Sequence, residues 1–189
     1  MAVRGPVGRG EPEPGGHPED APGDPEAVAK AICLRLLTVS AKPRAVLATA
    51  LRQRGIPDDV AEAVLTRFVE VGLIDDEAFA HAFVATKHRE RALGTAALRT
   101  ELRRKGVDEA IVDTAVRSID EEGERERARA LISRRVDAAM GNGVVAARRR
   151  LVGLLARRGY SAELSRAVVD EALAEYGAET EGDGGGWVG

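Results

Sequence analysis

Apolar residues recur at fixed distances from three glycines in the middle of the chain, which we call the register glycines. These are Gly55, Gly106 and Gly159, and they lie 51 and 53 residues apart. Apolar side chains stand eight and four residues before each glycine and five and nine residues after it: Leu47, Leu98 and Leu151; Leu51, Leu102 and Leu155; Val60, Ile111 and Leu164; Val64, Ala115 and Val168. A spacing of four marks one face of an α-helix, so each register glycine separates two amphipathic helices.

A third helical segment precedes each of these helix pairs. The three segments read EAVAKAICLRLL, EAFAHAFVATKHRER and ERERARALISRRV. A second set of glycines, Gly72, Gly123 and Gly177, follows the first by 17, 17 and 18 residues and predicts where each unit ends. Since no segment alternates as a β-strand does, we predict an all-α fold of about nine helices in three tandem three-helix repeats. We place these repeats at residues 26–75, 76–123 and 124–177.

The register glycines also predict how the preceding helices end. In a Schellman motif, a glycine in the left-handed conformation follows the helix, and the next residue makes an apolar contact back to it. Val107 and Leu102 occupy this pair of positions around Gly106, and the same pairing recurs around the other two register glycines. We therefore expect all three to lie at helix C-termini.

Both ends of the chain differ in composition from this repeated body. Residues 1–25 hold six of the eight prolines and five carboxylates, and residues 178–189 are rich in glycine. Segments with so few apolar residues cannot offset the entropy that is lost on ordering. The sequence therefore predicts disordered tails at both ends.

The net charge of −3 is unevenly distributed along the chain. Residues 26–177 hold 26 basic and 23 acidic side chains, so the body is mildly basic. Basic residues concentrate at 87–105 and 124–158, and acidic residues at 58–77 and 108–122. The helix macrodipole accounts for basic residues only in the last turn of a helix. Two interpretations stay open: basic and acidic surfaces on opposite sides that bind a partner, or solvated faces linked by salt bridges.

The sequence offers no convincing catalytic, cofactor or metal site. It has no phosphate-binding GxxxxGK[ST] loop, and His81 and His88 lack cysteines or clustered carboxylates at metal-ligand spacing. Asp75 and Asp76 precede a helix, where one caps it and the other complements its first turn. Cys33, the single cysteine, lies in an apolar run and is expected in the core. We expect no enzyme activity, no cofactor and no metal ion.

No segment reads as a signal peptide or a membrane span. Residues 1–10 lack an apolar stretch, and there is no run of about 18 apolar residues. Aromatic residues make up only 3% of the chain, which argues against a surface that stacks nucleic-acid bases. We expect a cytoplasmic, monomeric protein that does not bind a membrane.

Two short segments of the middle repeat carry recognisable motifs. VGLIDDEAFAHAFV at 71–84 has a Gly-Leu-Ile-Asp-Asp-x-x-Phe-Ala pattern at Gly72, Leu73, Ile74, Asp75, Asp76, Phe79 and Ala80. LRTELRRKGVDEAIVDTAV at 98–116 has a Glu-Leu-x-x-Lys-Gly-Val pattern at Glu101, Leu102, Lys105, Gly106 and Val107. Over residues 26–177 the chain resembles the RecX family of regulators of the RecA recombinase. The first repeat departs with Arg54 in place of the lysine, and the third keeps mainly the leucine spacing and Gly159.

This resemblance implies an elongated, curved tandem of three three-helix repeats without catalytic activity. It also implies binding in the helical groove of the RecA nucleoprotein filament. The filament's ATPase, strand exchange and growth would be inhibited, in recombinational DNA repair and the SOS response. On this hypothesis the basic helices face acidic protein surface or the phosphates of enclosed DNA. The candidate contact residues are Arg99, Arg103, Arg104, Lys105, Arg148, Arg149 and Arg150, with Lys87, Arg89 and Arg91 behind them.

Two other hypotheses stay open on the residues alone. Clustered arginines are also typical of a protein that binds single- or double-stranded nucleic acid directly, although the small net charge and scarce aromatic residues argue against it. Helical repeats also commonly serve as scaffolds for other proteins.

Overall fold

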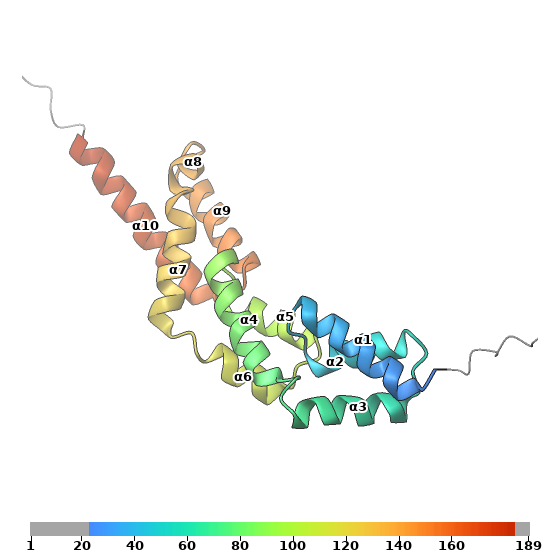
Figure 1. Cartoon of the computed structure of the whole chain (residues 1–189). Coiled ribbons are helices and arrows are strands. Elements are labelled where there is room, and N and C mark those ends of the chain that lie inside the picture. Colours follow the sequence, from blue (N-terminus) through green and yellow to red (C-terminus); the bar gives the residue numbers. More distant parts are fainter. Residues whose placement is uncertain (1–22, 184–189) are drawn as a thin grey trace, which may run out of the picture.

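The computed structural model describes residues 23–183, which contain helices and no strand (Figure 1). The helices are α1 (Pro25–Val39), α2 (Arg44–Arg52), α3 (Asp58–Glu70), α4 (Asp76–Arg91), α5 (Thr95–Arg104), α6 (Glu109–Val116), α7 (Glu121–Ser133), α8 (Val136–Met140), α9 (Val144–Arg157) and α10 (Ala162–Asp183). The prediction of an all-α fold is confirmed. Most of the two predicted tails, residues 1–22 and 184–189, lies outside the described residues.

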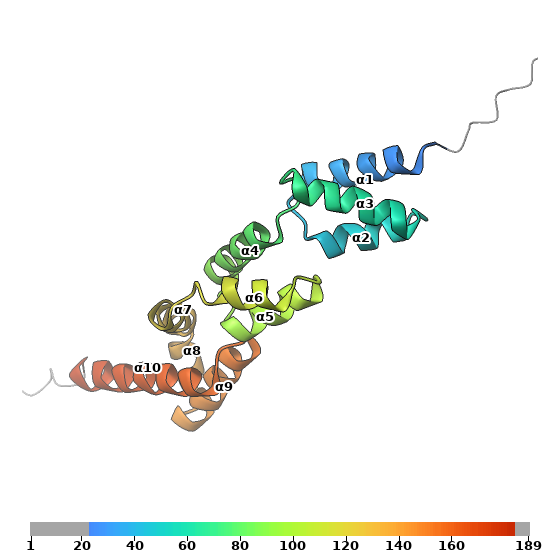
Figure 2. The same cartoon turned by 90° about the horizontal axis from the view of Figure 1, so that it is seen from below.

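The helices form three successive units, each with its own hydrophobic core. Buried clusters surround Leu51 within α1–α3, Leu102 within α4–α6, and Leu155 within α7–α10. The helix pairs that pack most extensively all lie within one unit, so the units touch mainly through helix ends and turns. Figures 1 and 2 show the units following one another in a bent, elongated array, with the first and last described residues at opposite ends.

The predicted helix ends at the register glycines are confirmed. At Gly106, the Val107 N–H donates to the Leu102 carbonyl at 3.3 Å, and the Gly106 N–H donates to the Arg103 carbonyl at 2.9 Å, which is the Schellman pattern. The other two register glycines have the same pair of hydrogen bonds. Each turn covers one end of a unit's core, because the apolar pairs are buried: Leu51 with Ile56, Leu102 with Val107, and Leu155 with Tyr160.

The third unit differs from the prediction in three ways. Gly123 lies in the first turn of α7, where its N–H donates to the Asp120 side chain at 2.7 Å, so the second unit ends before this glycine. Gly177 lies within α10, which continues to Asp183 and passes the predicted boundary at residue 178. The helix predicted over 124–136 ends at Ser133, because the backbone leaves helical geometry at Arg135 (φ −127°, ψ −8°), and the short helix α8, which was not predicted, follows it. The described part of the chain therefore has one helix more than predicted.

Neighbouring units are joined by carboxylates that cap a helix of the preceding unit. Asp76 in α4 accepts the Arg44 N–H at the start of α2 at 2.8 Å. Glu124 in α7 accepts the Thr95 N–H at the start of α5 at 2.8 Å. Neither α2 nor α5 has a side-chain cap of its own, so the next unit supplies a partner for an N–H that the helix leaves unpaired. Asp75 caps α4 as predicted, whereas the contact of Asp76 with the preceding unit was not predicted.

Two register glycines also lie where neighbouring units approach closely. A Cβ at Gly159 would meet the Ala97 backbone in α5 and lie 2.5 Å from the Ala97 Cβ. A Cβ at Gly106 would lie 2.5 Å from the Ala45 Cβ in α2. Gly55, in the first of the units within residues 23–183, has nothing within 4 Å of the same position. In the second and third units, the register glycine thus ends a helix and also permits docking on the preceding unit.

The junction between the second and third units has additional backbone hydrogen bonds. The Gly94 N–H donates to the Arg158 carbonyl at 2.8 Å, and the Ala96 N–H donates to the Gly159 carbonyl at 3.2 Å. In the first unit, Pro43 occupies the position of Gly94 relative to the register glycine. Proline has no N–H, so the junction between the first and second units lacks the first of these bonds.

Candidate partner-binding surface

Two of the predicted contact residues in α5 pair with carboxylates of α6. Arg103 contacts Glu109 through two nitrogen atoms, with Nε 2.7 Å from Oε2. The hydrogen bond from Arg103 lowers the pKa of the Glu109 carboxyl. Arg99 Nε lies 3.3 Å from Asp113 Oδ1. Ion pairs at the surface contribute little to stability individually, but these occupy side chains that were expected to be available to a partner.

The third unit has similar pairs between its basic helices and α10. Arg148 in α9 binds Asp170 through two nitrogen atoms at 2.6 and 2.7 Å, and this hydrogen bonding lowers the pKa of Asp170. Arg125 and Arg129 in α7 bind Glu171 at 2.5 and 2.6 Å. The hydrogen bond from Arg129 lowers the pKa of Glu171 the most, and the hydrogen bond from Arg125 lowers it further. For these side chains, the structure favours solvated faces linked by salt bridges.

The remaining predicted residues lie in three settings. Lys87 and Lys105 each place the ammonium group 5.5 Å from the centre of the Phe83 ring. Arg89 and Arg91 lie at the end of α4 and line a groove between units. Three others are exposed and have no ion-pair partner in the described part of the chain: Arg104, Arg149 and Arg150. The predicted basic residues therefore do not form one surface.

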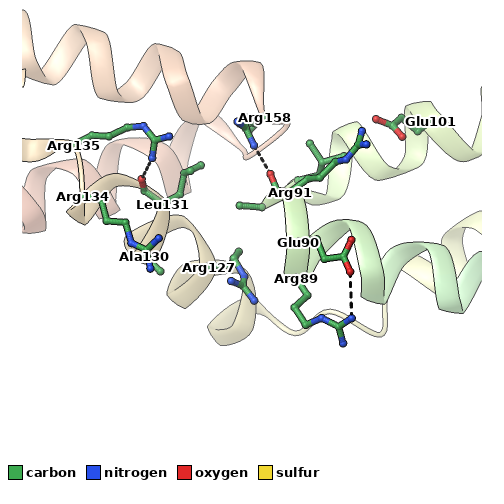
Figure 3. A pocket seen from close by; sticks show the side chains of 12 residues that line it. Arg89, Glu90, Arg91, Glu101, Arg127, Ala130, Leu131, Arg134, Arg135 and Arg158 are labelled. Carbon is green, nitrogen blue, oxygen red and sulfur yellow. Dashed lines mark hydrogen bonds and ion pairs between the residues drawn. The ribbon is translucent and has the colours of Figure 1, made fainter.

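The groove between the second and third units concentrates basic side chains, and we call it the arginine groove. It has a volume of about 670 Å³ and lies between the end of α4, α5, α7 and the end of α9 (Figure 3). Its charged lining residues are Arg89, Arg91, Arg127, Arg134, Arg135 and Arg158, with Glu90 and Glu101. Six guanidinium groups against two carboxylates give a positive potential, which favours an anionic ligand.

Some of these arginines are held by the protein itself. Arg158 donates to the carbonyl of the last residue of α4, and Arg135 Nη1 donates to the Leu131 carbonyl at 2.7 Å. The Arg89 guanidinium lies 3.6 Å from the Glu90 carboxylate. Groups engaged in this way support the groove walls and are less available to a ligand.

Three arginines of the groove have no ion-pair partner among residues 23–183. They are Arg91, from the second unit, and Arg127 and Arg134, from α7 and its C-terminal end in the third unit. Figure 3 shows that the labelled arginines come from both units. Guanidinium groups form strong, bidentate hydrogen bonds with carboxylates and phosphates. This trio is therefore the part of the groove best suited to bind a partner.

The turn that ends α4 fixes one wall of the groove. Ala92 has the left-handed conformation (φ +48°), and its carbonyl accepts a hydrogen bond from the Tyr160 hydroxyl at 3.2 Å. Burial raises the pKa of Tyr160 to about 12, so the hydroxyl stays protonated well above neutral pH and donates this hydrogen bond throughout. His88 Nδ1 lies 2.9 Å from the Leu93 carbonyl within the same turn. Because Tyr160 belongs to the third unit, its contact with Ala92 holds the two walls together.

The sequence predicts only part of the arginine groove. Arg89 and Arg91 are predicted contact residues, whereas Arg127 and Arg134 belong only to the basic segment 124–158. The count of charged residues therefore pointed to the right segment. It could not show which arginines of that segment line the groove, because this depends on how the second unit docks on the third.

The described residues contain no group of three or more His, Cys, Asp or Glu side chains that could hold a metal ion. Cys33 is buried in the core of the first unit, as expected, and burial raises the pKa of its thiol. Of the helices within residues 23–183, none is long and apolar enough to cross a membrane.

Two solved structures share this arrangement of helices. The crystal structure of RecX from Lactobacillus salivarius aligns with a TM-score of 0.74 over 78% of this chain and 96% of that chain, at 18% identity. A crystal structure of regulatory protein RecX aligns with a TM-score of 0.70 over 78% of this chain and 72% of that chain, at 23% identity. At these identities the similarity establishes the fold.

Sequence relatives establish the family. Family models described as the first and second three-helix domains of RecX match residues 29–68 and 75–116. The regulatory protein RecX of Streptomyces coelicolor is 50% identical over 162 residues, which cover 86% of each chain. The regulatory protein RecX of Thermobifida fusca is 49% identical over 181 residues, which cover 96% of each chain. This chain therefore belongs to the RecX family of regulatory proteins.

Proposed function

We propose that this chain binds the RecA nucleoprotein filament and inhibits its ATPase, strand exchange and filament growth, in recombinational DNA repair and the SOS response. Membership of a family of regulatory proteins supports a regulatory role. The observation that carries the proposal is the arginine groove, whose unpaired arginines suit an acidic protein surface or the phosphates of enclosed DNA. A ligand that binds one state of the filament more tightly shifts the filament toward that state.

The array of units suits a long partner with repeated subunits. Each unit has its own core, and the units follow one another along an elongated path (Figure 2). Contacts made by several linked units reinforce one another, because the first contact raises the effective concentration of the next. One bound chain would thereby connect neighbouring RecA subunits and restrict the movement between them.

The test reverses the three unpaired arginines of the groove together: Arg91→Glu, Arg127→Glu and Arg134→Glu. We expect the wild-type protein to inhibit the DNA-stimulated ATPase of RecA. The triple variant should need at least about ten times more protein for the same inhibition, since tenfold corresponds to only about 1.4 kcal/mol of binding free energy. The ATPase rate is measured against the concentration of each protein.

A second triple variant serves as the matched control, with Arg35, Arg54 and Arg166 changed to glutamate. These arginines are exposed and lie outside the groove, and the change in net charge is the same. Circular dichroism checks that both variants stay helical. Equal losses in the two variants would show that net charge, and not the groove, is responsible. No inhibition by saturating wild-type protein would reject the proposed function.

Direct binding of nucleic acid is a second candidate function, which the six arginines of the groove favour. Phosphate contacts release counterions, so affinity falls as salt rises, and each contact with single-stranded DNA makes the slope of log affinity against log salt steeper by about 0.7. If the groove binds free DNA, this slope should be shallower by about two for the groove variant, which lacks three arginines. Absence of binding to a single-stranded oligonucleotide near physiological salt would exclude this candidate.

A further inference from the structure

A different groove lies between the first and second units, and we call it the phenylalanine groove. It has a volume of about 660 Å³, within the range of about 300 to 1,000 Å³ that is typical of binding sites. Its apolar lining residues are Ala41, Leu73, Ala78, Phe79, Ala82 and Phe83. Leu73 and Phe79 belong to the Gly-Leu-Ile-Asp-Asp motif segment, yet Leu73 is 47% exposed and Phe79 is only half-buried. The side chains of this motif segment are therefore partly on the surface and available to a partner.

Two of the three phenylalanines of the chain line this groove. The rings of Phe79 and Phe83 stack with their centres 5.9 Å apart. The third, Phe68, is in the core of the first unit and only 5% exposed. Aromatic residues make up only 3% of the chain, so a stacked pair that is left half-exposed stands out from the rest of the surface. Aromatic side chains placed this way are typical anchors of protein interfaces.

Three lysines lie in or beside this groove. The ammonium groups of Lys87 and Lys105 each lie 5.5 Å from the centre of the Phe83 ring, and Lys42 lines the groove from the α1–α2 connection. None of the three lysines forms an ion pair within the described part of the chain. Asp75, a carboxylate of the lining, is engaged in capping α4. The groove thus combines an apolar floor with a positively charged rim.

We propose that the phenylalanine groove docks a protein segment in which one large apolar side chain is flanked by carboxylates. The apolar side chain covers Leu73 and the two rings, and the carboxylates face the lysines, as in the apolar core and polar rim of protein interfaces. A nucleobase fits less well, because two ammonium groups already lie over the Phe83 ring. This inference deepens the proposed function by assigning protein docking and anion binding to separate grooves. Only its second experiment rests on that function.

The first experiment uses no RecA. A short peptide with a central Phe between Asp and Glu residues is titrated to millimolar concentration against the isotope-labelled protein, and amide chemical shifts are followed by NMR. We expect shifts at Leu73, Phe79 and Phe83 that saturate with peptide and weaken with salt. Leu73→Asp should reduce the affinity at least about tenfold, since it removes apolar contact and repels the carboxylates. The matched control Val145→Asp, at a residue of α9 that is 85% exposed, should leave the affinity unchanged.

Three outcomes would overturn the inference. The first is no shift at the groove with millimolar peptide. The second is equal affinity for peptides in which Ser replaces the central Phe or Lys replaces the flanking acids. The third is tighter binding of an oligothymidine than of the peptide at these residues, which would assign the groove to nucleic acid instead.

The second experiment measures inhibition of the RecA ATPase by the same two variants. We expect Leu73→Asp to need at least about ten times more protein than wild type, and Val145→Asp to match wild type. If wild type and Leu73→Asp inhibit equally and the peptide does not bind, this inference fails while the proposed function stands. If the peptide binds in the groove but wild type does not inhibit RecA, the proposed function fails and the groove serves another protein.

Discussion

Gly159→Ala should lower the free energy of unfolding by about 2 to 5 kcal/mol. Gly159 has φ +86°, and a non-glycine residue in that left-handed conformation costs about 1 to 2 kcal/mol. The new methyl group would also overlap the Ala97 backbone, and overpacking of this kind costs about 1 to 3 kcal/mol. Ala97 lies in the first turn of α5, so it cannot retreat without disturbing the hydrogen bonds at the junction. Urea denaturation followed by circular dichroism measures the loss.

Gly55→Ala is the matched control for this prediction. Gly55 has φ +73° but nothing lies within 4 Å of the point where the new methyl group would stand, so only the conformational cost of about 1 to 2 kcal/mol applies. The Gly159 variant should also lose amide-exchange protection at Gly94 and Ala96, which donate across the junction. Equal losses of stability, with protection retained at both amides, would mean that the close approach at Gly159 does not hold the units together.

Leu102→Ala should destabilise the second unit by about 2 to 5 kcal/mol, the usual cost of truncating a fully buried leucine. Leu102 has no exposed surface and lies in the cluster enclosed by α4–α6. The loss combines the apolar area returned to water with the cavity left behind. A thermal melt measures the overall loss of stability. Because repeat arrays can unfold unit by unit, amide hydrogen exchange should also be measured, and we expect the loss of protection to be largest within α4–α6.

Leu73→Ala, at a leucine of the other motif, is the comparison for Leu102→Ala. Leu73 is 47% exposed, so its truncation should cost less than about 1 kcal/mol. The same chemical change at two motif positions therefore separates a residue of the core from a residue of the surface. A loss at Leu73 as large as that at Leu102 would contradict the assignment of Leu73 to a binding groove.

Features determined by neighbouring residues were predictable from the sequence. The turns at the register glycines depend on a left-handed residue, an apolar contact and two local hydrogen bonds, all encoded within about six residues. The cap that Asp75 places on α4 is equally local. The family also followed from two short motifs of the middle repeat, and the relatives confirm it. The spacing of the second set of glycines predicted a wrong unit boundary at Gly123. Gly123 follows Gly106 by 17 residues, as Gly72 follows Gly55, but it lies in the first turn of α7 and not past the end of a helix.

Features that join different helices were not predictable in the same way. Arg103 was a candidate contact residue, but its pairing with Glu109 requires α5 and α6 to lie side by side. The arginine groove requires α7 to face the end of α4, which depends on the docking of two units. Counts of charged residues identified the basic segments, but they did not show which side chains form ion pairs. Similarly, motif membership did not reveal that Leu73 is exposed.

The two junctions of the array differ in the backbone hydrogen bonds that hold them. The first is held by the hydrogen bond from Arg44 to Asp76 and by contact at Gly106, and Pro43 removes a donor that the second junction has. The second junction adds backbone hydrogen bonds at Gly94 and its neighbours. Local opening costs less free energy where fewer such bonds must break. We therefore expect the junction between the first and second units to bend more easily than the junction between the second and third, so that it acts as the hinge of the array.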